Sequence, residues 1–240
     1  MKVIGKDIGE PLDELYGQIE QRLRIEAERE LRVEPFEDAA FSNVSWRDDV
    51  VVISLHNGVP THALPHIFGV ALHHVRQRLD HYPAVRPPPD TVVAADDSGP
   101  SLVRTALREL VLAPEAGTQL EPLGLDLQWE VEQRHEGIKD MVRDAAPDWD
   151  EAGTPGNAFA ALQYARTALQ HPPDLWESLR ENITQRMPVA AENGEGVLQV
   201  IGAHGWSTAA NCLLSLVAAR DELGLQSIAA IEDRRTNDLH

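Results

Sequence analysis

The chain has 240 residues, which is enough for one large domain or two small ones with an ample buried core. It carries 39 acidic and 21 basic side chains, and the resulting net charge of −18 repels phosphate backbones, so we expect no nucleic-acid partner. No apolar run approaches the length of about 18 residues needed to span a membrane. The N-terminal residues lack the apolar stretch of a secretory signal and the single cysteine permits no internal disulfide, so we predict a cytoplasmic protein.

The first predicted element is an amphipathic helix at 11–31, where apolar residues recur at short helical spacings between charged ones. Two β-rich segments follow, FSNVSW at 41–46 and DVVVISL at 49–55. The short polar break between them predicts a hairpin, and the second segment is apolar enough to be covered on at least one face.

A second helix is predicted at 65–79, after the turn-forming pair Asn57-Gly58. Thr61 is the expected N-cap, and the proline at position 65 suits a first helical turn. The proline-rich and then turn-rich stretch at 85–100 is expected to be a connector.

Most of the remaining chain is predicted to be helical. Apolar periodicity indicates further helices at 101–113, 125–145, 157–170, 173–187 and 207–223. A turn-rich break predicts three regions, at 1–145, 146–157 as a linker, and 158–240, which could still pack as one domain. The tail at 233–240 is expected to be frayed, with Asp233 in solvent. The predicted class is α+β and predominantly helical, with a small N-terminal hairpin or sheet packed on a helical bundle.

A histidine cluster is the most informative chemical feature of the sequence. Six of the ten histidines lie between His56 and His81, and no glutamate occurs between Glu37 and Glu109. Clustered imidazoles beside an apolar helix are typical of zinc sites. The cluster therefore has candidate metal ligands but lacks a local glutamate that could act as a base.

Helical spacing divides these histidines between two faces. Each residue of a helix advances about 100°, so His66 and His73 fall roughly opposite the apolar arc, where we expect a solvated face. His74 falls at the edge of the arc. There it is either a buried, hydrogen-bonded imidazole or a functional one.

The hairpin, the turn and the segment LPHIFGVALHHVRQRLDHYP together resemble the active-site region of small cytoplasmic zincin-like metallopeptidases, over about residues 41–126. In that family a strand precedes a helix with the motif H-E-x-x-H, whose histidines bind zinc and whose glutamate activates water. Alignment of the last motif histidine with His74 places Val70 at the first histidine and Ala71 at the glutamate. Alignment on His73 also leaves both positions without the required side chains. The resemblance thus implies a zincin-like fold without standard peptidase chemistry.

The same resemblance implies a third metal ligand from a later helix. The segment RELVLAPEAGTQLEPLGLD at 108–126 offers three glutamates for this role, namely Glu109, Glu115 and Glu121. A zinc site with an unconventional ligand set would use His66, His74 and Glu115, with His73 and Glu109 as alternates.

Three hypotheses for function follow. The leading one is a catalytically degenerate metallopeptidase-like protein that acts by binding a protein partner, as a regulator or scaffold, with no catalytic residue and no resident cofactor. The second is a metal-dependent hydrolase, with zinc as the candidate metal, that uses the non-standard His/Glu set. The third is a helical protein-interaction module unrelated to zincins. The oligomeric state is left open by the sequence.

Overall fold

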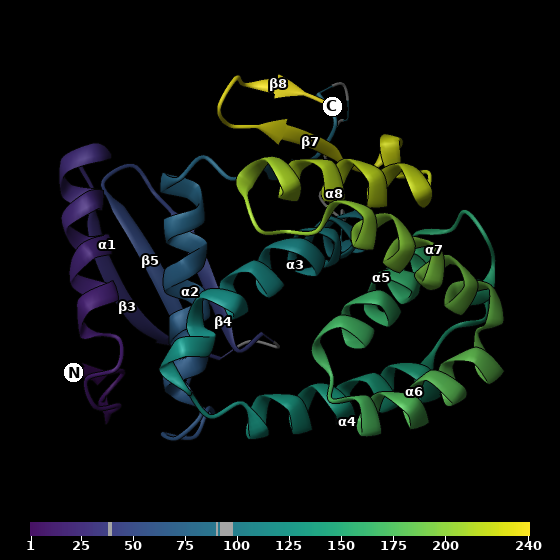
Figure 1. Ribbon diagram of the computed structural model, residues 1–240, viewed down its shortest axis with the longest axis horizontal. Helices are drawn as coiled ribbons and strands as arrows, with labels where there is room; N and C mark the ends of the chain where they lie inside the picture. Colours follow the sequence, from purple (N-terminus) through teal and green to yellow (C-terminus); the bar gives the residue numbers. More distant parts are fainter. Residues whose placement is uncertain (38–39, 90, 92–97) are drawn as a thin grey trace. The chain divides into compact units, whose positions relative to one another are not determined.

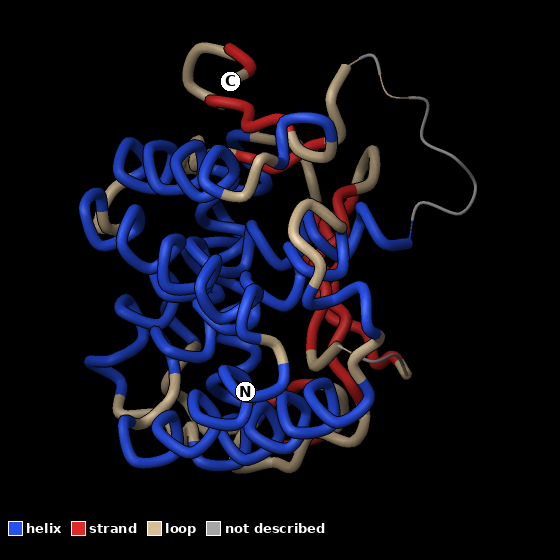
Figure 2. The backbone as a smooth tube through the Cα atoms, turned by 90° about the vertical axis from the view of Figure 1, so that its right-hand side faces the viewer, coloured by secondary structure: helices blue, strands red, loops and turns tan. Residues whose placement is uncertain are grey.

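The computed structural model describes residues 1–37, 40–89, 91 and 98–240. This described part is α+β and predominantly helical, which confirms the predicted class, and Figure 2 distinguishes its helices from its short strands by colour. The chain forms two compact units. Unit 1 contains 1–80 and 116–130, and unit 2 contains 81–115 and 131–240. Most of the second half of the predicted connector, at 92–97, lies outside the described residues.

Unit 1 contains a small mixed sheet with two helices packed against it (Figure 1). Its strand order is β3-β5-β4, with β3 parallel and β4 antiparallel to the central strand β5. The strands are β3 (Glu30–Phe36), β4 (Ser42–Trp46) and β5 (Val50–His56), and a short pair precedes them, β1 (Lys2–Val3) and β2 (Lys6–Asp7). The helices are α1 (Asp13–Glu26) and α2 (Leu64–Leu79).

The sheet confirms the predicted hairpin and corrects the first predicted helix. The hairpin joins β4 to β5, and the main-chain N–H of Arg47 donates to the oxygen of Val50 at 2.9 Å. The predicted helix at 11–31 is too long, because α1 ends at Glu26 and β3 begins at Glu30. Since every residue of β3 pairs with β5, the sheet overrides the local helical pattern.

Helix α2 packs into the core of unit 1 through its apolar arc, as the sequence predicts. Phe68, Ala71 and Leu72 are fully buried in the core of unit 1. Gly69 permits a close approach in this core, because a Cβ there would lie only 2.8 Å from the nearest side-chain carbon of Leu120. The predicted Thr61 cap is wrong, since α2 begins without a side-chain cap and has proline in its first turn instead.

Unit 2 is built mainly from helices, with a small antiparallel sheet of order β6-β7-β8. Helix α5 packs closely against α7, and α7 packs against α8 (Figure 1). The α-helices are α3 (Ser98–Leu120), α4 (Gln128–Asp144), α5 (Pro155–Gln170), α6 (Pro173–Arg186), α7 (Pro188–His204) and α8 (Ala209–Glu222). The short 3-10 helices are η1 (Glu121–Leu123), η2 (Pro147–Asp150) and η3 (Leu225–Ser227). The strands are β6 (Ala84–Arg86), β7 (Ala230–Asp233) and β8 (Asp238–Leu239). The end of α3, all of η1 and the first residues of α4 belong to unit 1.

The C-terminal tail is ordered, contrary to the prediction of a frayed end. Strands β7 and β8 pair antiparallel across its turn. Asp233, expected in solvent, is only 6% exposed, and it accepts hydrogen bonds from the guanidinium of Arg235 at 2.9 and 2.6 Å. This contact lowers the pKa of the Asp233 carboxyl, chiefly through the side-chain hydrogen bond from Arg235. The segment 146–157, predicted as a linker, contains η2 and the first turn of α5.

Candidate functional site

The histidines of the cluster have separate local environments in the structure. His56 accepts a hydrogen bond at its Nδ1 from the main-chain N–H of Gly58, at 2.9 Å, and so stabilises the turn after β5. His62 and His81 are exposed. The remaining three histidines lie on α2, each with a different partner.

His66 forms the clearest chemical pair in unit 1. Its Nδ1 lies 2.7 Å from a carboxylate oxygen of Glu130, at the start of α4, and the two side chains are only 12% and 16% exposed. Trp129, the residue before Glu130, contacts Phe41 with a ring-centroid distance of 5.0 Å, which holds this end of α4 in place. Because a carboxylate only accepts, Nδ1 carries the hydrogen, and the pair fixes both the tautomer and the orientation of the ring.

His73 corrects the predicted solvated face of α2. It is only 6% exposed, and its Nδ1 accepts a hydrogen bond from Nε of Arg76 at 2.8 Å. The buried face of α2 is wider than the apolar arc, because the polar residue Gln77 is also buried, at 2% exposure. His74 lies at the edge of the core, as expected, and its Nδ1 is 2.9 Å from the amide oxygen of Gln77.

The candidate glutamates are found in three settings. Glu115 is 2% exposed and accepts a hydrogen bond from the hydroxyl of Tyr82 at 3.1 Å, within unit 2. Glu109 pairs with Arg108 at 2.6 Å, also in unit 2. Glu121 is exposed in unit 1. A buried carboxylate such as Glu115 is unusual, and its hydroxyl partner offsets part of the cost of burial.

The structure does not gather the predicted metal ligands into one group. His66 and His74 are separated by two turns of α2, a rise of about 12 Å along the helix. Within residues 1–37, 40–89, 91 and 98–240, no three histidine, cysteine or acidic side chains lie close enough to form a metal site. The zinc site of His66, His74 and Glu115 therefore stays a prediction.

Glu130 is the site residue that the sequence did not reveal. It lies 64 positions from His66 along the chain, in a helix whose charged residues otherwise read as a solvated face. Its one local signal is its position directly after Trp129, a large side chain that anchors the helix end. Only the tertiary structure of unit 1, which holds the first residues of α4 near the start of α2, brings the carboxylate to the imidazole.

The two positions that align with the first histidine and the glutamate of H-E-x-x-H contribute to packing. Ala71 is fully buried in the core of unit 1, and Val70 is half-buried against it. Neither side chain has an atom that binds a metal or accepts a proton. At these positions α2 supplies hydrophobic contacts.

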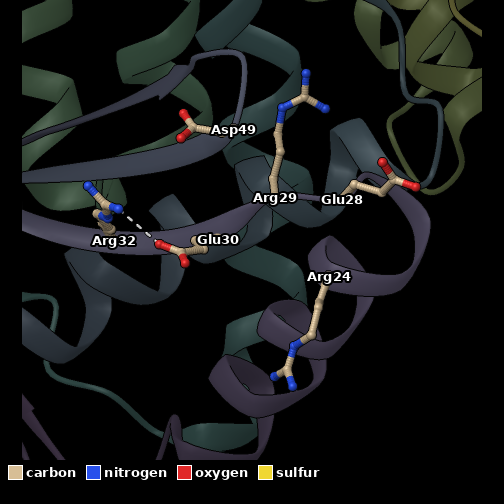
Figure 3. Close-up of a pocket in the computed structure, with 6 residues that line it drawn as sticks. All are labelled: Arg24, Glu28, Arg29, Glu30, Arg32 and Asp49. Carbon is tan, nitrogen blue, oxygen red and sulfur yellow. Dashed lines mark hydrogen bonds and ion pairs between the residues drawn. The ribbon is translucent and has the colours of Figure 1, made fainter.

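A charged pocket lies in unit 1 where α1 ends and β3 begins (Figure 3). Its lining alternates in sign, and it consists of Arg24, Glu28, Arg29, Glu30, Arg32 and Asp49. Arg32 pairs with Glu30 at 2.9 Å, and Nε of Arg29 donates to the main-chain oxygen of Arg47 at 2.9 Å. In Figure 3 the side chains of Arg24 and Arg29 point away from each other, so the arginines do not converge on one ligand. None of the sequence-predicted site residues lies here.

Replacing Glu130 with glutamine is expected to lower the free energy of unfolding by about 1 kcal/mol, because a charge-assisted hydrogen bond becomes a neutral one. Urea titration followed by tryptophan fluorescence measures this loss. Glu136→Gln is the matched control, since Glu136 forms an exposed pair with Lys139 on the same helix at 2.9 Å. Equal losses of unfolding free energy in the two variants would show that the His66–Glu130 pair stabilises the fold no more than an exposed ion pair does.

Comparisons with known proteins found no match for this chain among family models, curated proteins or solved structures. No helix in the described ranges combines the length and the apolar character that crossing a bilayer requires.

Proposed function

We propose that this chain is a catalytically degenerate metallopeptidase-like protein that acts by binding a protein partner. The observation that carries the proposal is the full burial of Ala71, where the zincin-like alignment requires the glutamate that activates water. The order of β5, a turn and α2 supports the alignment, because a strand leads into the helix of interest. The support for the proposal is thus the order of strand, turn and helix, together with a core residue at the position that aligns with the catalytic glutamate.

Two exposed leucines in the segment before Glu130 support a role in binding. Leu123 and Leu127 are 42% and 45% exposed in the segment that leads into α4, just before Trp129 and Glu130. Large exposed apolar side chains lose contact with water when a partner covers them, which favours association. We therefore place the partner contact on this segment of unit 1.

The test combines metal analysis, peptidase assay and partner binding. Protein purified without chelator or histidine tag is expected to contain no stoichiometric zinc and to leave unfolded protein substrates uncut, with or without added zinc. Affinity for a captured partner is expected to fall at least about tenfold in Leu127→Lys, while Leu214→Lys, a change of an equally exposed leucine in unit 2, leaves it unchanged. Stoichiometric zinc that is lost on mutation of His74 would contradict the proposal.

A metal-dependent hydrolase is the second candidate, and the His66–Glu130 pair favours it. Metal-binding histidines commonly donate their second ring nitrogen to a carboxylate, as His66 does, which leaves Nε2 as the ligand atom. In that case His66→Ala would weaken zinc binding strongly, and the exposed control His62→Ala would have little effect.

A further inference from the structure

Unit 2 contains a pair of histidines whose buried ring nitrogens lack partners. His135 lies on α4, and His171 follows directly after α5, where the chain turns into α6. The centres of the two rings are 5.6 Å apart, and their planes differ by 20°. Nδ1 of His135 and both ring nitrogens of His171 are buried without a hydrogen-bond partner among the described residues. Such a group of atoms is unusual, because buried polar groups in native proteins are almost always hydrogen-bonded.

A proton on His171 is unfavourable in the folded protein. Burial, and after it the positive charges of Arg134 and His135 on α4, lowers the pKa of the His171 imidazole to about 4. The other charged groups close to the pair in sequence, on α4, α5 and α6, are exposed or hydrogen-bonded within their own helix, and they are Glu132, Glu136, Lys139, Arg166, Asp174 and Glu177. His171 is therefore uncharged near neutral pH while α4 stays in place.

Few apolar contacts hold α4 in unit 2. Its buried residues are Ile138 and Val142, which pack with residues of α5 and α6, and Met141 adds a half-buried contact. Lys139 and Arg143 pair with acidic residues of α4 itself, so these ion pairs are kept when the helix moves. A segment with few buried apolar contacts opens with less free energy than the whole domain needs to unfold. Residues 131–144 are therefore suited to separate from the rest of unit 2.

We propose that protonation of the His135–His171 pair releases α4 from α5 and α6 and exposes the apolar surface between them. In the closed form a proton on one ring repels a proton on the other, whereas water solvates both charged rings once α4 has moved away. The residues uncovered are Ile138 and Val142 on α4, Tyr164 on α5, and Leu179 and Ile183 on α6. The inference does not depend on the function proposed above.

The pH range of the release follows from the protons bound in each form. Below about pH 6.5 the open form binds a proton at His171 that the closed form does not, so opening becomes more favourable as the pH falls, and the gain levels off near pH 4. Between pH 7 and pH 5 the equilibrium constant for opening is expected to rise about 20-fold from His171 alone. Helix α7 packs closely against α5 and α8, so we expect it to stay folded over this range.

Hydrogen–deuterium exchange of the full chain, resolved by peptide mass spectrometry, measures the opening of each helix. Protection factors, which correct for the pH dependence of the intrinsic exchange rate, are expected to fall about 20-fold in α4 between pH 7 and pH 5. In α7 they are expected to change less than about twofold. Unchanged protection of α4 would overturn the proposal. An equal fall in α4 and α7 would also overturn it, since acid would then unfold the unit as a whole.

Two matched substitutions assign the release to the histidine pair. His171→Leu removes the titrating ring, so the fall in α4 protection between pH 7 and pH 5 is expected to shrink to less than about threefold. His204→Leu makes the same change at a half-buried histidine at the end of α7 and is expected to keep the full fall. Far-UV circular dichroism checks that both variants fold. A full fall in His171→Leu would mean that another group takes up the proton and would contradict the proposal.

A permanent charge tests the release without acid. His135→Lys places an ammonium group close to the His171 ring and is expected to lower the protection of α4 several-fold at pH 7. Gln133→Lys adds the same charge at an exposed position of α4 and is expected to leave the protection unchanged. Equal protection in His135→Lys and the wild-type protein would show that a positive charge at this position does not open the helix, and would overturn the proposal.

Discussion

Glutamate in place of Ala71 is expected to unfold unit 1 rather than to create a peptidase site. Ala71 has no exposed surface and is enclosed by the core of the unit, so the new carboxylate would be buried without a partner. Burial of an unpaired charge places the expected loss at about 4 kcal/mol or more, a large part of the stability of a typical domain. Thermal unfolding followed by circular dichroism measures the loss.

The neighbouring position provides the matched control. Val70 lies on the same helix and is half-buried, so Val70→Glu can direct its carboxylate to solvent and is expected to cost only about 1–2 kcal/mol. A folded double variant of Val70→His and Ala71→Glu that cleaved peptides with zinc would contradict this expectation. It would also show that α2 can present an introduced H-E-x-x-H motif to a substrate.

Acidification is expected to destabilise unit 2 through His171. This residue, just after α5, is only 7% exposed, and neither ring nitrogen has a hydrogen-bond partner among the described residues. Burial, with the nearby charge of Arg134 and the ring of His135, lowers the pKa of the His171 imidazole from 6.5 to about 4. The rings of His135 and His171 lie 5.6 Å apart, so a proton on either would also repel a proton on the other.

The direction of the pH effect follows from the lowered pKa. Between about pH 6.5 and pH 4 the unfolded chain binds a proton at His171 that the folded chain does not, so stability falls as the pH falls through this range. The loss from this single group is expected to reach about 2 kcal/mol at pH 5 and to level off below pH 4. Urea titrations at a series of pH values measure it.

A leucine at position 171 separates this effect from the other titrating groups. His171→Leu removes the buried ring nitrogens, so we expect about 1 kcal/mol of added stability near neutral pH and a flatter pH dependence. His62→Leu is the control, because His62 is exposed. An unchanged pH dependence in His171→Leu would show that the imidazole binds a proton equally well in the folded and unfolded states, and would contradict the lowered pKa.

Local patterns in the sequence predicted the elements whose stability is mostly local. Helix α2 follows from its apolar arc, and the β4–β5 hairpin follows from two β-rich runs separated by a polar turn. Strand β3 was missed because its first residues continue the charged, helix-forming composition of α1. Helix α7 was missed because its glycines weaken the helical pattern, and one of them, Gly194, allows the Tyr164 ring to pack closely. In both cases a distant element determines the local structure.

The candidate site was predictable in its helix but not in its chemistry. Spacing placed His66, His73 and His74 on α2, yet it assigned His73 to solvent, because polar residues such as Gln77 were not expected on the buried face. The pairing of His66 with Glu130 depends on the path of the chain through α3 and η1 before α4 begins. This path depends on tertiary packing, which the local patterns of a single sequence do not reveal.

Unit 1 is assembled from two separate stretches of chain, and this limits how the protein can be divided. The stretch at 116–130 returns to the unit after an excursion of 81–115 through unit 2, and it brings Leu120 against Gly69 in the core. A fragment ending near residue 80 would therefore expose core surface, and closing the long excursion slows the search for native contacts. The two units could not be exchanged between proteins as independent modules by simple gene fusion, so we expect them to be inherited together.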